Sequence, residues 1–177
     1  MRLVGALVGI LVVLAVLAGA AAIGYVRTTG LTGQPEPGAL ETLVARRVRA
    51  FAVPGDIRTL TNQVPASADQ VRAGLEHYAR YCQMCHGVDG SGATSAIGRG
   101  LFPKPPDMRG AATQQLTDGE LFYIIENGVR FTGMPAFGSG RLDDPGAPLA
   151  WQLVRFIRHL PQLTADERGE IEGMSPL

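Results

Sequence analysis

Cys82-Gln83-Met84-Cys85-His86 holds the only two cysteines of the 177-residue chain, and no other stretch constrains the fold as strongly. The pattern C-x-x-C-H is the attachment signature of a c-type haem. Two thiols three residues apart on a helical turn can form thioethers with the two vinyl groups of one porphyrin. The adjacent histidine then lies under the iron as an axial ligand. The motif therefore predicts one haem c, attached through Cys82 and Cys85 and ligated by His86.

Three other uses of a C-x-x-C pair fit the chain less well. A structural zinc site needs about four Cys or His ligands, and only His77 and His159 remain. We interpret both as surface or half-buried helix residues. A thioredoxin-like motif follows a strand in a βαβ unit, whereas a helical pattern precedes this pair and a glycine-rich loop follows it. A plain disulfide is possible but leaves His86 without a role.

The composition excludes one class of partner. Sixteen basic residues balance sixteen acidic ones, so the formal net charge is zero. A protein that binds a polyanion usually carries a basic excess. We therefore expect no nucleic-acid partner.

The N-terminus carries most of the aliphatic excess. Residues 3–25 are almost unbroken apolar sequence between Arg2 and Arg27. A helix of about 23 residues is roughly 35 Å long, enough to cross a hydrocarbon core of about 30 Å. A cleaved signal peptide is the alternative, because the small residues at 18–22 suit a peptidase. The apolar run continues through Ile23, which favours an uncleaved anchor, and both interpretations carry the remainder across the membrane.

Residues 28–66 connect this segment to the motif-bearing part of the chain. Gly, Pro and Thr dominate 28–39, which predicts a linker. Residues 40–51 have apolar side chains at helical spacing and three nearby arginines, which predicts a short amphipathic helix. It would pack on the rest of the protein, lie on anionic headgroups or dock on a membrane partner. Residues 53–69 read as an extended connection.

Helical patterns dominate the remaining sequence, and no alternating strand pattern appears. Ser67 or Asp69 can cap a helix over about 70–81 that leads into the motif. Residues 87–115 are rich in Gly and Pro and read mostly as loop. Thr117, with Glu120 three residues on, forms a capping box that opens a second helix ending at Gly128. A third helix is expected from about 148 to 160, and a short charged one from 164 to 172.

Residues 70–161 resemble the class I cytochrome c family. The resemblance rests on C-Q-M-C-H at 82–86, on T-G-M-P at 132–135 and on the order of the helices. It is nearest to membrane-anchored bacterial monohaem cytochromes, which share the pattern Y-x-x-Y-C-x-x-C-H-G-x-D-G-x-G seen at 78–92. The resemblance implies an all-α fold around one covalently bound haem, here preceded by a single N-terminal transmembrane helix.

Within that family the helix before the motif crosses the C-terminal helix. A glycine and an aromatic residue on the first helix face an aliphatic and an aromatic residue on the second. Gly74 and Tyr78 match the first pair, and Leu153 and Phe156 match the second. Glycine allows close approach because it has no side chain to hold the backbones apart.

The sixth iron ligand is expected to be a methionine. Three of the five methionines lie in the anchor, in the attachment loop and in the tail, which leaves Met108 and Met134. Met134 lies in a Gly-Met-Pro loop that matches the family's axial position, so the resemblance assigns it the ligand role. Met108 is then an apolar wall of the haem crevice.

The resemblance also implies residues around the haem. An axial histidine needs an acceptor for its far ring nitrogen. The family uses a proline carbonyl, which Pro106 matches best and Pro105 second. Arg99 and Arg109 would pair with the propionates or remain solvated, and Trp151 would pack near the haem edge.

These observations predict four segments. They are an N-terminal anchor or signal peptide (1–27), a linker with a helix at 40–51 (28–66), a cytochrome c domain (67–163) and a C-terminal tail (164–177). The haem domain is expected on the periplasmic face of a bacterial inner membrane.

Three functions remain open. The first is an electron carrier of a respiratory chain, with a redox protein as donor and another as acceptor and no small-molecule substrate. The second is a fixed cytochrome subunit of a membrane dehydrogenase or oxidase complex. The third is a haem enzyme or gas sensor in which Met134 is displaced, which two filled axial positions disfavour.

Overall fold

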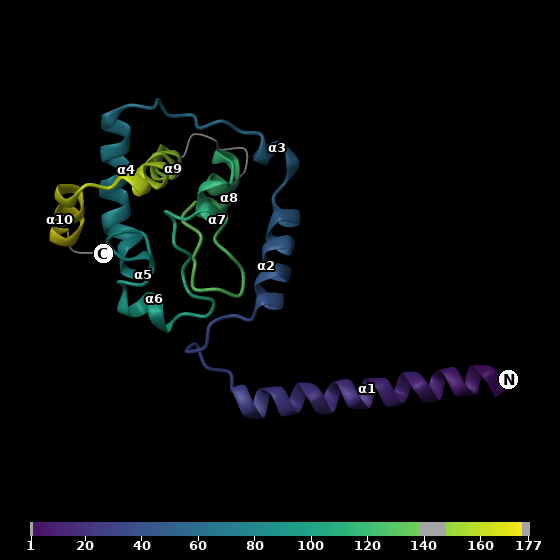
Figure 1. The fold of residues 1–177 in the computed structure, drawn as a ribbon. Coiled ribbons are helices and arrows are strands. Elements are labelled where there is room, and N and C mark those ends of the chain that lie inside the picture. Colours follow the sequence, from purple (N-terminus) through teal and green to yellow (C-terminus); the bar gives the residue numbers. More distant parts are fainter. Residues whose placement is uncertain (1, 139–147, 175–177) are drawn as a thin grey trace. The chain divides into compact units, whose positions relative to one another are not determined.

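The computed structural model describes residues 2–138 and 148–174, and it divides the chain into two compact units. Unit 1 is Met1–Gly33 and unit 2 is Gln34–Leu177. The described residues form helices joined by turns and loops, without a strand (Figure 1). The all-α fold class is therefore confirmed.

Unit 1 is built on one helix, α1 (Arg2–Thr29). Its 28 residues make a helix of about 42 Å at 1.5 Å per residue. The segment Leu3–Thr28 is long and apolar enough to cross a membrane, as judged by length and composition. The structure thus agrees with a candidate anchor and leaves its cleavage untested.

Unit 2 begins with two helices that precede the haem motif. The helix expected at 40–51 is α2 (Ala39–Ala52), and none of its residues is buried. Its large apolar side chains are exposed, so that face does not pack on the described part of the protein, and the interfacial and docking interpretations stay open. The connection expected to be extended contains the short helix α3 (Gly55–Arg58), whose Ile57 is buried. A single helical turn after Pro54 is too short to give a periodic signal.

Two crossing helices form the centre of unit 2. They are α4 (Ala68–Tyr81), capped by Ser67, and α9 (Pro148–His159). At the crossing, a Cβ added to Gly74 would lie 2.8 Å from Cβ of Phe156, closer than real Cβ contacts allow. The rings of Tyr78 and Phe156 lie 5.1 Å apart. The helix pairing implied by the resemblance is therefore confirmed.

The third main helix, α8 (Asp118–Asn127), packs on α9. Thr117 and Glu120 form the predicted capping box, and Gly128 ends the helix with φ +64°. Phe122 of α8 stacks on Trp151 of α9 with ring centroids 4.1 Å apart. Both side chains are buried, so α8 shares the apolar core of α4 and α9.

Shorter helices complete unit 2. The region expected to be mostly loop holds α6 (Ala96–Gly100) and α7 (Ala111–Gln114), each only four or five residues long. After α9 the chain forms a 3₁₀ turn (Leu160–Gln162) and then α10 (Ala165–Gly173). Ile171 of α10 is fully buried in the core, so α10 packs on the fold.

Candidate haem site

The attachment motif occupies a helical turn that continues α4. Its helix, α5 (Gln83–His86), follows directly after Cys82. The amides of Cys85 and His86 both donate to the carbonyl of Cys82, at 3.1 and 2.9 Å. Both thiols are free, and both cysteines are half-buried. The turn therefore has the helical spacing that two thioether bonds require.

Four residues predicted for the site meet in one narrow crevice. Cys82 and His86 line it together with Met108 and Met134. The other lining side chains are apolar or aromatic: Tyr78, Ile125, Phe137, Leu153 and Ile157. The free space is about 30 Å³, so the walls must separate to admit a porphyrin. Thiol, imidazole and thioether groups in an apolar crevice fit a covalently attached haem.

Burial sets the protonation of the attachment residues. It raises the pKa of the Cys82 thiol to about 12 and also raises that of Cys85. It lowers the pKa of His86 to about 4, so the imidazole is neutral at pH 7. A neutral imidazole keeps a nitrogen lone pair for a metal. Nδ1 of His86 is buried and has no hydrogen-bond partner among the described residues, so the bond to Pro106 stays a prediction.

The loop after the motif folds back to bring Met108 to the crevice. The hydroxyl of Tyr78 donates to the carbonyl of Gly87 at 2.6 Å, which fixes the start of the loop. Gly90 has φ +75°, a conformation that side chains disfavour. Its carbonyl accepts from the amide of Met108 at 2.9 Å. Met108 is 6% exposed, as expected for a crevice wall.

A second loop carries Met134. The carbonyl of Met134 accepts from the amide of Val129 at 3.0 Å, and its amide donates to Oγ1 of Thr132 at 3.1 Å. A Cβ at Gly128 would lie 2.7 Å from the Met134 carbonyl oxygen. The loop is therefore folded tightly against the end of α8, with Met134 half-buried.

The remaining predicted residues lie outside the set that lines the crevice. Arg109 forms ion pairs with Asp107 at 2.9 Å and Asp89 at 3.1 Å, and Arg99 donates to a backbone carbonyl. Trp151 is fully buried in its stack with Phe122. Roles for these three residues toward haem stay predictions.

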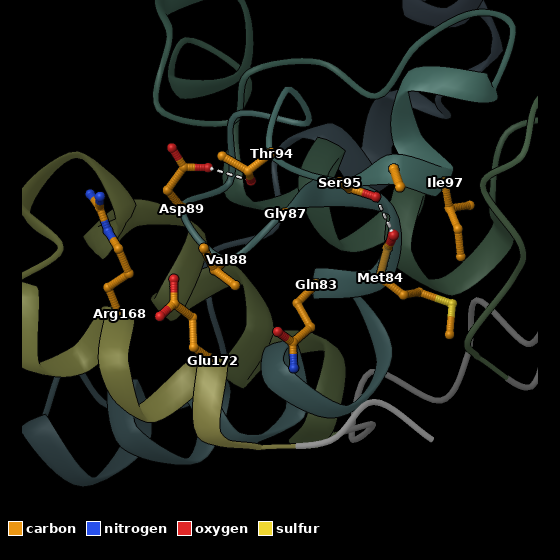
Figure 2. A pocket seen from close by; sticks show the side chains of 11 residues that line it. Gln83, Met84, Gly87, Val88, Asp89, Thr94, Ser95, Ile97, Arg168 and Glu172 are labelled. Atoms are coloured by element: carbon orange, nitrogen blue, oxygen red, sulfur yellow. Dashed lines mark hydrogen bonds between the residues drawn. The ribbon is translucent and has the colours of Figure 1, made fainter.

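Other residues hold the attachment turn from outside and gave no signal in the sequence. The amide of Gln83 donates to the carbonyls of Ala79 and Met174, at 2.6 and 2.7 Å. The hydroxyl of Ser95 donates to the carbonyl of Met84 beside a surface hollow of about 510 Å³ (Figure 2). The bonds to Met174 and from Ser95 join residues 91 and 11 positions apart in the sequence, so periodicity could not predict them.

Comparison with protein families identifies the class of this protein. The family described as "Cytochrome C oxidase, cbb3-type, subunit III" matches residues 69–157, just over half of the chain. The match runs from α4 to α9 and includes the motif and the Met134 loop. The chain belongs to this family. No curated protein matches the chain.

The family match confirms the resemblance to class I c-type cytochromes. A cytochrome c domain binds haem c and transfers electrons with redox protein partners. The fold and the crevice agree with that role.

Proposed function

We propose that this cytochrome carries one electron at a time in a respiratory chain, on one haem c with His86 and Met134 as axial ligands. The main observation in support of this function is that His86 and Met134 line one apolar crevice, although 47 residues lie between them in the sequence. Cys82 and Cys85 would hold the haem covalently, and its iron would supply the one-electron couple.

The surroundings of the crevice suit electron transfer better than catalysis. A methionine thioether stabilises ferrous iron relative to a second imidazole, so His/Met ligation favours a higher potential. Two protein ligands also deny the iron to dioxygen and peroxide. The lining side chains are apolar apart from the ligands and Tyr78, whose hydroxyl is already bonded to Gly87.

We also propose that α1 is an uncleaved anchor that places the haem domain on the periplasmic face of a bacterial inner membrane. Its length and its apolar composition support a membrane span. Haem attachment in c-type cytochromes, as the resemblance implies, takes place on that face. Alkaline carbonate extraction tests the anchor, because a cleaved or peripheral protein would leave the membrane fraction.

Replacing each crevice methionine tests the ligand assignment. Met134→Ala should abolish the weak near-infrared sulfur-to-iron band of the ferric protein and let the ferrous protein bind carbon monoxide. Met108→Leu is the matched control, since it conserves volume and should keep the band. A band that survives Met134→Ala and disappears in Met108→Leu would make Met108 the ligand. Rapid carbon monoxide binding by the unaltered protein would favour the enzyme or sensor alternative.

The family description favours one alternative, a fixed cytochrome subunit of an oxidase complex. Mild detergent extraction followed by native gel electrophoresis separates the two functions. A free carrier should migrate as a lone small haem-staining species. Migration with larger subunits would instead support the fixed-subunit function.

A further inference from the structure

The helix α2 exposes an apolar face that the fold of unit 2 does not use. Its large apolar side chains are 52–92% exposed: Leu40, Leu43, Val44, Val48 and Phe51. At 100° per residue these five positions fall within a sector of about 140°, which also contains Arg47. An exposed apolar patch of this kind is typical of an interaction surface.

The opposite side of α2 is partly buried. Thr42 and Arg49 lie about 180° from the apolar sector and are half-buried. Burial lowers the pKa of Arg49, although the nearby charge of Glu120 opposes that shift. Arg58 donates to the carbonyl of Ala50 and pairs with Glu120 at 3.3 Å. Arg58 therefore links the end of α2 to Glu120 of α8, and the more buried side of α2 lies opposite its apolar face.

The charge of α2 is complementary to an anionic surface. The helix has three arginines and one acidic residue, Glu41. Arg46 and Arg47 are exposed. Arg46 lies beside the apolar sector and Arg47 lies within it. A helix that combines an apolar face with basic residues is typical of segments that lie in a membrane interface. The long stem of Arg47 can rest on the apolar face while its guanidinium reaches the headgroups.

The tether to α1 keeps α2 near a bilayer. Nine residues, 30–38, separate the end of α1 from the start of α2. Ten Cα–Cα steps span at most about 35 Å when fully extended. Lys104 of the haem domain also donates to the carbonyl of Gln34 at 3.2 Å, which holds part of this tether on unit 2. The helix α2 therefore begins within about 35 Å of the end of the proposed membrane span.

We propose that α2 is an interfacial helix that inserts its apolar face into the bilayer crossed by α1, with Arg46 and Arg47 on anionic headgroups. This inference rests on the proposed membrane anchoring by α1. Two attachment points would restrict how the haem domain turns above the membrane. The haem domain would then approach its redox partners in a limited range of orientations.

The test uses the full-length haem-loaded protein, one copy per nanodisc, with phosphatidylcholine and phosphatidylglycerol. Single cysteines at Val44 and Val48 carry a nitroxide, and Ala45 on the flank and Ala165 on α10 serve as control positions. Because the native cysteine sulfurs form thioethers, unaltered protein should take up no label. Collision with dioxygen, which enters lipid, is compared with collision with a polar nickel chelate.

The proposal expects labels at Val44 and Val48 to meet dioxygen several-fold more often, and nickel several-fold less often, than the label at Ala165. The label at Ala45 should be intermediate. Replacing phosphatidylglycerol by phosphatidylcholine, or making Arg46→Gln with Arg47→Gln, should weaken the contrast. Free nickel access at Val44 and Val48 would overturn the proposal. Shielding from both probes would overturn it too, because a covering protein excludes both.

Failure of the anchor gives a different result. If α1 does not span the bilayer, the protein is released by carbonate and does not enter the discs. If the protein enters the discs but the labels at Val44 and Val48 stay open to nickel, only the role of α2 is refuted. The two proposals can therefore fail separately.

Discussion

Gly74→Ala tests the helix crossing on which the site is built. A Cβ at this position would lie 2.8 Å from the carbonyl carbon of Gln152 and 2.8 Å from Cβ of Phe156. Neither atom can rotate away, because one is backbone and the other is the first atom of its side chain. The helices α4 and α9 must therefore move apart, and α4 leads directly into the attachment turn.

The magnitude follows from two opposing effects. Alanine is better than glycine in a helix interior by about 1 kcal/mol. Overpacking costs about 1–3 kcal/mol, and the rigid obstructing atoms place this site at about 3 kcal/mol. The net loss of unfolding free energy is then about 2 kcal/mol. For a unit of this size the midpoint of thermal unfolding should fall by about 4–8 °C.

The assay is unfolding of the haem-loaded protein by heat and by denaturant, followed by far-ultraviolet circular dichroism. The matched control is Gly169→Ala in α10, where an added Cβ meets nothing within 4 Å. That variant should be as stable as the unaltered protein or gain up to about 1 kcal/mol. If Gly74→Ala behaves like this control, the close crossing of α4 and α9 is refuted.

Two further predictions concern helix caps. Burial alone would raise the pKa of Glu167, but hydrogen bonds from Thr164 and His159 outweigh it and lower that pKa. Because the pKa is lower in the folded protein, the ionised carboxylate stabilises the fold at pH values above its ordinary pKa of 4.5. This stabilisation is lost as the pH falls through the folded-state pKa. The unaltered protein should thus lose more stability than Glu167→Gln between pH 7 and pH 3 in denaturant titrations, and equal losses would contradict the assignment. Thr117→Ala removes a side-chain cap and should cost about 1 kcal/mol in the same assay, whereas Thr117→Ser should restore most of it.

The main helices and the attachment turn could be predicted because their signals are local. The capping box at Thr117 and the cap at Ser67 are short patterns, and the structure confirms both. Periodic apolar residues likewise predicted α4, α8 and α9 within a few positions. The helix α3 and the helices between 87 and 115 were missed, because four or five residues cannot establish a period.

Side-chain assignments beyond the motif depended on contacts that no local pattern contains. Arg109 forms ion pairs with Asp107 and Asp89, and its role toward a propionate stays a prediction. Asp89 lies 20 positions away in the sequence, across the folded loop. The sequence also left open whether the apolar face of α2 packs on the protein, lies on headgroups or docks on a partner. Periodicity reports which side chains share a face and not what covers that face.

The elements that carry site residues are positioned by close backbone approach more than by charge. A Cβ at Gly98 of α6 would lie 3.3 Å from the carbonyl carbon of Cys85, and one at Gly128 would lie 2.7 Å from the carbonyl oxygen of Met134. Each approach joins a site residue to a neighbouring segment without an ion pair, so salt and surface mutation should affect the crevice little. The same approaches leave no room for an added methyl group, since backbone atoms cannot change rotamer. Substitution of these glycines should therefore disturb haem ligation sooner than substitution of the arginines around the crevice.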